Sequence, residues 1–165
     1  MVDCMKDRFF ARDEYFMRLA LREAERALEH DDVPIGAVVV HDGEVIGAGG
    51  NERELRQDPT AHAEILALRE AAHALGSWRV LESVMYVTLE PCAMCAGAIV
   101  LARFDRLVFG AWDDKAGMVG SVGDLVRNPK LNHRAEVLGG VRADECGALL
   151  REFFAQKRKH LTPNT

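Results

Sequence analysis

Hydrophobic residues occur along the chain in two arrangements, and each indicates a different kind of element. Apolar residues at helical spacing, such as Phe16, Leu19 and Ala20, form one stripe between charged positions. This spacing predicts helices over 13–30, 60–75, 92–103 and 144–160. Short apolar runs predict strands over 35–40, 44–48, 84–89 and 106–111, with a further strand within 134–141. Helices that alternate with strands indicate a sheet covered by helices on both faces.

Turn residues separate these elements. Asp42-Gly43 is a strong hairpin signal, so the strands before and after it should pair antiparallel. Thr60 is expected to cap the helix over 60–75, and Gly76 is expected to end it. The polar stretch 52–58 and the glycine-rich stretch 112–132 are expected to be loops.

The chain is expected to form one domain. Its 165 residues suffice for one hydrophobic core, and no repeat or linker-like stretch interrupts the pattern. The expected organisation is an N-terminal extension (1–11), a single domain (12–160) and a C-terminal tail (161–165).

The composition, with 48% hydrophobic and 28% charged residues, is typical of a globular protein and excludes a disordered or fibrous class. No apolar run reaches the ~18 residues of a membrane span. The charged start of the chain also lacks the apolar segment of a secretory signal, so we expect a cytoplasmic protein. A net charge of −5 does not favour nucleic-acid binding. The C-terminal helix is nevertheless locally basic through Arg151, Lys157, Arg158 and Lys159.

Two short motifs carry the candidate chemistry. His62-Ala63-Glu64 is an H-x-E motif, and Pro91-Cys92-Ala93-Met94-Cys95 is a P-C-x-x-C motif. One imidazole and two thiols form a soft ligand set suited to zinc. Thiols stay reduced in a protein that is not exported, so a C-x-x-C motif indicates metal binding or redox activity. Cys4 and Cys146 have no partner pattern and are expected to be a tail thiol and a small buried residue.

Both motifs fall at predicted helix starts beside the carboxyl ends of strands, where ligands bind in such sheets. Three interpretations are open: incidental residues, a structural zinc site in a non-catalytic nucleic-acid-binding module, and a catalytic zinc site. The shared placement disfavours coincidence. Structural zinc usually has four protein ligands, and the fourth would have to be Glu64, His133, Cys146 or another distant group. Catalytic zinc is favoured because three protein ligands leave one position for water.

In the catalytic interpretation, zinc lowers the pKa of a bound water toward about 7 and Glu64 takes the proton. Hydroxide attacks the carbon that bears the exocyclic amine, while Glu64 protonates a ring nitrogen and then the departing ammonia. The H-x-E and P-C-x-x-C pattern is the signature of zinc-dependent nucleobase deaminases, a group that includes the tRNA adenosine deaminases.

Longer stretches extend this likeness beyond the zinc motifs. They cover residues 33–37, 58–65, 87–92, 94–98, 132–134 and 143–146. In these stretches, and in their order and spacing over about residues 12–158, the chain resembles the TadA family of bacterial tRNA-specific adenosine deaminases. The resemblance implies a three-layer α/β/α cytidine-deaminase-like fold with a central mixed five-stranded sheet. It also implies a homodimer that converts adenosine to inosine at the wobble position of a tRNA anticodon stem-loop, with arginine tRNA as the expected substrate.

Carried over residue by residue, the resemblance implies one zinc ion per subunit on His62, Cys92 and Cys95, with Glu64 as the proton shuttle for attack at carbon 6 of adenine. Three further residues match positions that contact the substrate in this family: Asn51, Asp113 and Phe153. The closest rival is a small-molecule deaminase of the same superfamily, acting on guanine, cytosine or deoxycytidylate, because it would share the zinc chemistry.

Overall fold

The computed structural model describes the backbone of residues 2–161 and the side chains of residues 10–159. Five strands form one sheet in the order β2-β1-β3-β4-β5. The strands are β1 (Gly36–His41), β2 (Glu44–Gly50), β3 (Ser83–Leu89), β4 (Arg106–Ala111) and β5 (Glu136–Gly139). β1 pairs antiparallel with β2 and β3, whereas β4 pairs parallel with β3 and β5. The sheet is therefore mixed and five-stranded, as expected.

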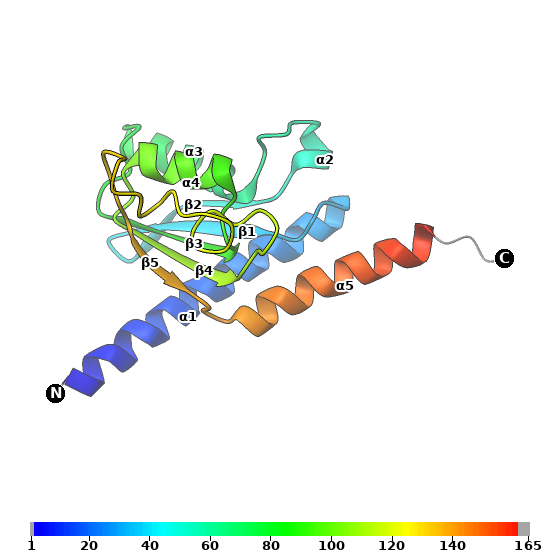
Figure 1. The fold of residues 1–165 in the computed structure, drawn as a ribbon, viewed down its shortest axis with the longest axis horizontal. Coiled ribbons are helices and arrows are strands. Elements are labelled where there is room, and N and C mark those ends of the chain that lie inside the picture. The colour runs from blue at the N-terminus through cyan, green and yellow to red at the C-terminus, as the bar shows by residue number, and fades with distance from the viewer. Residues whose placement is uncertain (1, 162–165) are drawn as a thin grey trace.

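Helices cover both faces of this sheet. They are α1 (Val2–Ala27), the 3-10 helix η1 (Leu28–His30), α2 (Arg53–Arg56), α3 (Ala63–Leu75), α4 (Ala93–Ala102) and α5 (Ala143–Leu161). Figure 1 shows α3 and α4 on one face, and α1 and α5 on the other. The three-layer α/β/α prediction is confirmed. None of the helices within residues 2–161 combines the length and the apolar content that crossing a membrane requires.

Alternate residues of the central strands supply two hydrophobic cores. Met85 and Leu107 are fully buried in the core beneath α3 and α4. Their neighbours Tyr86 and Val108 point to the opposite face and pack with residues of α1 and α5. This alternation follows from the two-residue period of a strand, and it makes β3 and β4 buried on both faces.

The hairpin between β1 and β2 forms as predicted. Asp42 and Gly43 both have positive φ angles, 49° and 83°, which suit a tight two-residue turn. On β2, a Cβ added at Gly47 would lie only 2.2 Å from the carbonyl oxygen of Ala67. The glycine therefore allows α3 to lie directly against β2.

The second predicted loop, over 112–132, contains no helix and no strand apart from one isolated bridge between Val119 and Asp124. The first predicted loop, over 52–58, was wrong in part because it contains the single-turn helix α2. The buried carboxylate of Asp32 accounts for this turn, since it accepts hydrogen bonds from the backbone N–H groups of Glu54 (2.8 Å) and Leu55 (3.1 Å).

The prediction that Thr60 caps α3 was also wrong. The helix begins at Ala63, and His62 occupies the N-cap position. Thr60 instead donates from both its backbone nitrogen (2.8 Å) and its hydroxyl group (2.7 Å) to Asp58 Oδ1. Asp58 thus forms a local turn that competes with capping. The predicted end at Gly76 is confirmed, with this residue in the left-handed conformation at the C-cap.

The first helix is longer than the sequence prediction of 13–30. α1 runs from Val2 to Ala27, because residues 2–12 contain no proline or glycine that would end a helix. The division into an extension, a domain and a tail stays a prediction. Residues 162–165 of the predicted tail and the side chain of Cys4 lie outside the described residues. Cys146 is 2% exposed, which confirms that it is buried.

Candidate active site

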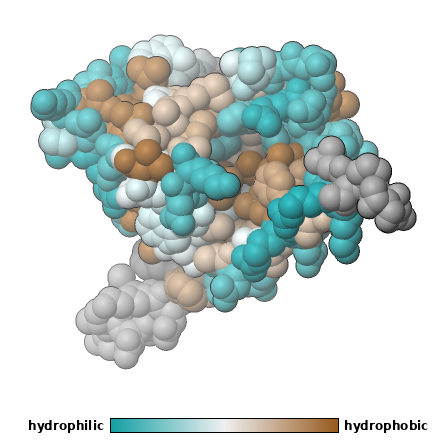
Figure 2. All heavy atoms as spheres, turned by 45° about the vertical axis from the view of Figure 1, so that its right-hand side comes forward, coloured by the Kyte–Doolittle hydropathy of each residue, from teal (hydrophilic) through white to brown (hydrophobic). Residues whose placement is uncertain are grey.

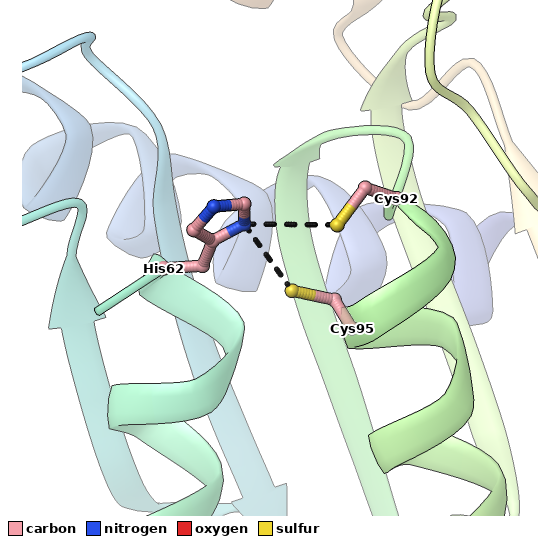
Figure 3. A group of neighbouring side chains, drawn as sticks. All are labelled: His62, Cys92 and Cys95. Atoms are coloured by element: carbon pink, nitrogen blue, oxygen red, sulfur yellow. Dashed lines mark hydrogen bonds between the residues drawn. The ribbon is translucent and has the colours of Figure 1, made fainter. Parts of the chain in front are cut away.

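The starts of α3 and α4 lie side by side and bring the two sequence motifs together. His62 is the N-cap residue of α3, Cys92 is the N-cap residue of α4, and Cys95 follows in the first turn of α4. His62 Nδ1 lies 3.7 Å from Cys92 Sγ and 3.5 Å from Cys95 Sγ. Figure 3 shows the imidazole and both thiols converging from the two helices. The three donor atoms lie within 4.8 Å of one another.

The chemistry of this cluster fits a soft cation. The hydrogen bond between the two sulfur atoms lowers the pKa of Cys92 to about 3 and raises the pKa of Cys95 above its ordinary value. Both cysteines are free thiols, so no disulfide competes for them. Two sulfur atoms and one ring nitrogen in contact are the donor set that zinc prefers. His62, Cys92 and Cys95 could therefore hold zinc with one coordination position left for another ligand.

Glu64 faces the same site from the first turn of α3. Its side chain is buried, and burial raises its pKa above the ordinary value of a glutamate. A buried carboxylate of raised pKa takes up a proton more readily than an exposed one, which suits a group that accepts and returns protons in acid–base catalysis. The structure thus brings Glu64 to the three candidate ligands, as the H-x-E motif predicts.

A pocket of about 170 Å³ opens in front of these residues. His62, Glu64 and Cys92 line it, together with two of the predicted substrate-binding residues, Asn51 and Asp113. Cys95 does not line the pocket and is fully buried. One pocket therefore contains an apolar lining, a candidate metal site, a buried acid and polar groups for a ligand, which is the usual composition of an active site.

Phe153, the third predicted substrate-binding residue, does not line this pocket. It lies on α5, is 8% exposed and stacks edge-on against Phe154 with ring centroids 5.4 Å apart. Lys157 Nζ lies 5.4 Å from the centre of the Phe153 ring. The structure therefore places Phe153 at the base of an aromatic and basic surface on α5, apart from the other predicted site residues.

Asn51 is held in one orientation at the pocket. Its Nδ2 donates a hydrogen bond to the carbonyl oxygen of Val33 at 3.1 Å. Its Oδ1 is buried and has no hydrogen-bond partner among the described residues. An unpaired buried acceptor is unfavourable, so this atom is ready to accept a hydrogen bond from a bound ligand.

Asp113 also lines the pocket. Its Oδ1 accepts hydrogen bonds from the backbone nitrogens of Lys115 (3.0 Å) and Ala116 (3.2 Å), while no hydrogen bond to its Oδ2 is found within residues 10–159. One carboxylate oxygen therefore shapes the local turn, and the other can accept a hydrogen bond from a ligand.

Sequence reasoning missed two charged residues of this pocket, Glu90 and Arg53. Glu90 is 2% exposed. Burial alone would raise its pKa, but hydrogen bonds from the segment 113–121 lower the pKa below the ordinary value. Its position immediately before the P-C-x-x-C motif is a signal that could have singled it out. Arg53 belongs to α2 and carries an exposed side chain, and the polar composition of its segment gave no such signal.

Comparison with known proteins agrees with this geometry. The sequence model of the MafB19-like deaminase family matches residues 11–158. The tRNA-specific adenosine deaminase of Bacillus subtilis is 49% identical over 148 residues, which cover 90% of this chain and 92% of that protein. The chain belongs to the tRNA-specific adenosine deaminase family. The Haemophilus influenzae member of this family is also 49% identical over 148 residues, covering 89% of this chain and 86% of that protein.

Solved structures extend the comparison to the fold. A tRNA:A34 deaminase from work on A-to-I editing at the wobble position superposes with a TM-score of 0.79 and 48% identity, covering 82% of this chain and 99% of that chain. A guanine deaminase from Nitrosomonas europaea superposes with a TM-score of 0.72 and 30% identity, covering 86% and 84% of the two chains. The family membership and the deaminase fold expected from the sequence motifs are confirmed.

Proposed function

We propose that this chain deaminates adenosine to inosine at the wobble position of a tRNA anticodon, with arginine tRNA as the expected substrate. The observation that carries the proposal is one pocket lined by His62, Cys92 and the buried acid Glu64, with Cys95 completing the three-ligand cluster. The names of relatives at 43–49% identity support the choice of tRNA as the substrate class. Because tRNA is a cytoplasmic substrate, the proposal includes a cytoplasmic location.

His62, Cys92 and Cys95 would hold one zinc ion per subunit. Zinc bound there would lower the pKa of a water molecule toward about 7 and so supply a nucleophile at neutral pH. Glu64 would take one proton from the attacking water and deliver it to a ring nitrogen of adenine. It would then take the second proton from the new hydroxyl group on carbon 6 and pass it to the amine, which leaves as ammonia while the carbon–oxygen double bond forms. The reaction consumes one water and releases one ammonia, so the single carboxylate returns to its starting state.

The remaining pocket residues orient the nucleoside. Asn51 Oδ1 accepts a hydrogen bond from the target nucleoside, because its amide nitrogen is already bonded to Val33. Asp113 Oδ2 accepts from the ribose 2′-hydroxyl group, and this contact separates RNA from DNA. Phe153 contributes from outside the pocket, by supporting Lys157 on the surface of α5 that meets the anticodon loop. Figure 2 shows hydrophilic residues along α5.

The same proposal includes a homodimer. The surface of α4 carries an apolar stripe at helical spacing, consisting of Met94, Gly97, Ala98 and Leu101. Leu101 is 67% exposed, and a Cβ added at Gly97 would meet no atom within 4 Å. An apolar helix face beside the candidate metal site is well suited to pack against the same face of a second subunit.

A test of the chemistry is the variant Glu64→Ala, compared with wild type on a stem-loop that carries wobble adenosine. We expect zinc content to stay at one per chain while inosine formation falls by at least about a hundredfold, because the proton shuttle is lost. Glu25→Gln, on the exposed side of α1, is the control and should behave as wild type. Retained turnover in Glu64→Ala would remove Glu64 from the mechanism.

A further inference from the structure

The carboxylate of Glu90 is buried between the sheet and the pocket. Glu90 directly follows β3 and precedes Pro91 and Cys92, and its side chain is 2% exposed. Four donors of the segment 113–121 surround its two oxygens. Oε2 accepts from the backbone nitrogen of Asp113 at 3.0 Å and from the hydroxyl group of Ser121. Oε1 accepts from the backbone nitrogens of Val119 and Ser121, each at 3.0 Å.

These hydrogen bonds take the place of the backbone hydrogen bonds that a helix or a strand would form in this segment. Residues 112–121 contain no helix or strand, and a single isolated bridge involves Val119. Buried backbone N–H groups need acceptors, which a neighbouring strand would otherwise supply. Glu90 supplies acceptors for three of them from one side chain. A charged acceptor forms stronger hydrogen bonds than a neutral one, so this contact fixes the course of the segment.

Gly117 lies so close to the Glu90 carboxylate that a side chain at this position would not fit. A Cβ added at this position would lie 2.3 Å from both Cδ and Oε2 of Glu90, and 2.6 Å from the carbonyl oxygen of Asp113. The segment therefore folds tightly around Glu90, and the absence of a side chain at Gly117 makes room for it.

The fixed segment forms one wall of the pocket. Asp113 and Ala116 line the pocket, and the backbone nitrogen of Asp113 is bonded to Glu90. We propose that Glu90 is a positioning residue. Its hydrogen bond to the backbone nitrogen of Asp113 holds Asp113 where the Asp113 carboxylate contacts the ribose of the bound nucleotide. The proposal rests on the proposed function, since it assigns Glu90 to binding of the RNA substrate rather than to the reacting atoms.

The sharpest test is Glu90→Gln, which keeps the size of the side chain. A Gln side chain has one acceptor oxygen and one NH2 group. With the Gln oxygen in the place of Oε1, the hydrogen bonds from the backbone nitrogens of Val119 and Ser121 are kept. The NH2 group then takes the place of Oε2, so the backbone N–H of Asp113 faces a donor and has no acceptor. We expect KM for the wobble-adenosine stem-loop to rise about tenfold and kcat to change less than about threefold. Zinc content should stay at one per chain.

Two further variants separate positioning from stability alone. Gly117→Ala pushes against the Glu90 carboxylate from the other side and should also raise KM. Ser121→Ala removes one hydroxyl donor, keeps the Asp113 bond, and should leave KM near the wild-type value. Amide hydrogen exchange should show faster exchange at Asp113 in Glu90→Gln than in wild type or Ser121→Ala.

The outcomes are distinguishable from failure of the proposed function. A wild-type protein that is inactive on the stem-loop would refute the proposed function, whereas exchange at Asp113 would still test the hydrogen bond. An active wild type with an unchanged KM in Glu90→Gln would overturn the positioning role. A fall in melting temperature with KM unchanged would equally overturn it, because that result assigns Glu90 to stability only.

Discussion

Asn51 offers a prediction in which stability and function respond differently. The variant Asn51→Ala removes one satisfied and one unsatisfied polar group from a side chain that is 3% exposed. The bond from Nδ2 to Val33 at 3.1 Å contributes about 1 kcal/mol to stability. The unpaired Oδ1 costs about 1–3 kcal/mol of desolvation, so its removal offsets the loss. We therefore expect the free energy of unfolding to change by less than about 1 kcal/mol.

The expected functional effect is larger. If Oδ1 accepts a hydrogen bond from the nucleoside, its loss should lower kcat/KM on the stem-loop by a factor of about 10 to 100. Urea unfolding of the zinc-loaded protein gives the first quantity, and initial rates of inosine formation give the second.

Thr88 provides a matched control from β3. It is 1% exposed, and its Oγ1 accepts a hydrogen bond from the backbone nitrogen of Gly36 at 3.1 Å. Thr88→Val leaves that N–H without an acceptor and should destabilise the protein by about 1–2 kcal/mol, while kcat/KM stays within about threefold of wild type. The reasoning about Asn51 is refuted if Asn51→Ala destabilises the protein by more than about 3 kcal/mol or leaves kcat/KM unchanged.

Three further predictions concern charge, burial and assembly. Arg53 lines the pocket, and its guanidinium group forms no hydrogen bond or ion pair within residues 10–159. Arg53→Gln should therefore weaken stem-loop binding and reduce the logarithmic salt slope by about one. Arg79→Gln, whose guanidinium stacks on Trp78, is the control and should change neither quantity. Burial raises the pKa of Cys146 from 9.0 to about 12. As pH rises, the thiol therefore ionises in the unfolded chain before it ionises in the folded protein, so the free energy of unfolding should fall between pH 9 and 12. In Cys146→Ala, which has no thiol at this position, the fall over the same pH range should be less steep. If the proposed homodimer forms through α4, Leu101→Glu should convert it to a monomer in analytical ultracentrifugation, whereas Leu28→Glu on η1 should not. A wild-type protein that is monomeric would contradict the proposed homodimer.

The sequence pattern predicted the elements whose signals are local. β4 was predicted with its observed bounds, because its apolar run follows the charged pair Asp105-Arg106 and stops close to the charged pair Asp113-Asp114. The N-cap of α3 was misplaced by two residues, at Thr60 instead of His62, since the hydroxyl group of Thr60 donates its hydrogen bond to Asp58. The start of α1 was missed because charged residues interrupt the apolar spacing over residues 2–12, which weakens the helical periodicity of the sequence.

The residues of the candidate site were likewise predicted where their sequence signal is local and missed where it is not. His62, Glu64, Cys92 and Cys95 were predicted because their chemistry lies in two short motifs at helix starts. Glu90 was missed because its partners lie 23 to 31 residues further along the chain, in a segment without a periodic pattern. Contacts of this kind depend on tertiary structure and leave no local signal in one sequence.

The most direct test of the account is inosine formation by the purified zinc-loaded protein. An arginine-tRNA anticodon stem-loop with wobble adenosine is compared with free adenosine, guanine, cytosine and deoxycytidylate under the same conditions. The account predicts inosine in the stem-loop and no turnover of the free compounds. Turnover of guanine or another free compound in place of the stem-loop would contradict it and assign the pocket to a small-molecule deaminase. Zinc binding at one ion per chain with no turnover of any substrate would contradict it as well, and would favour a structural zinc site.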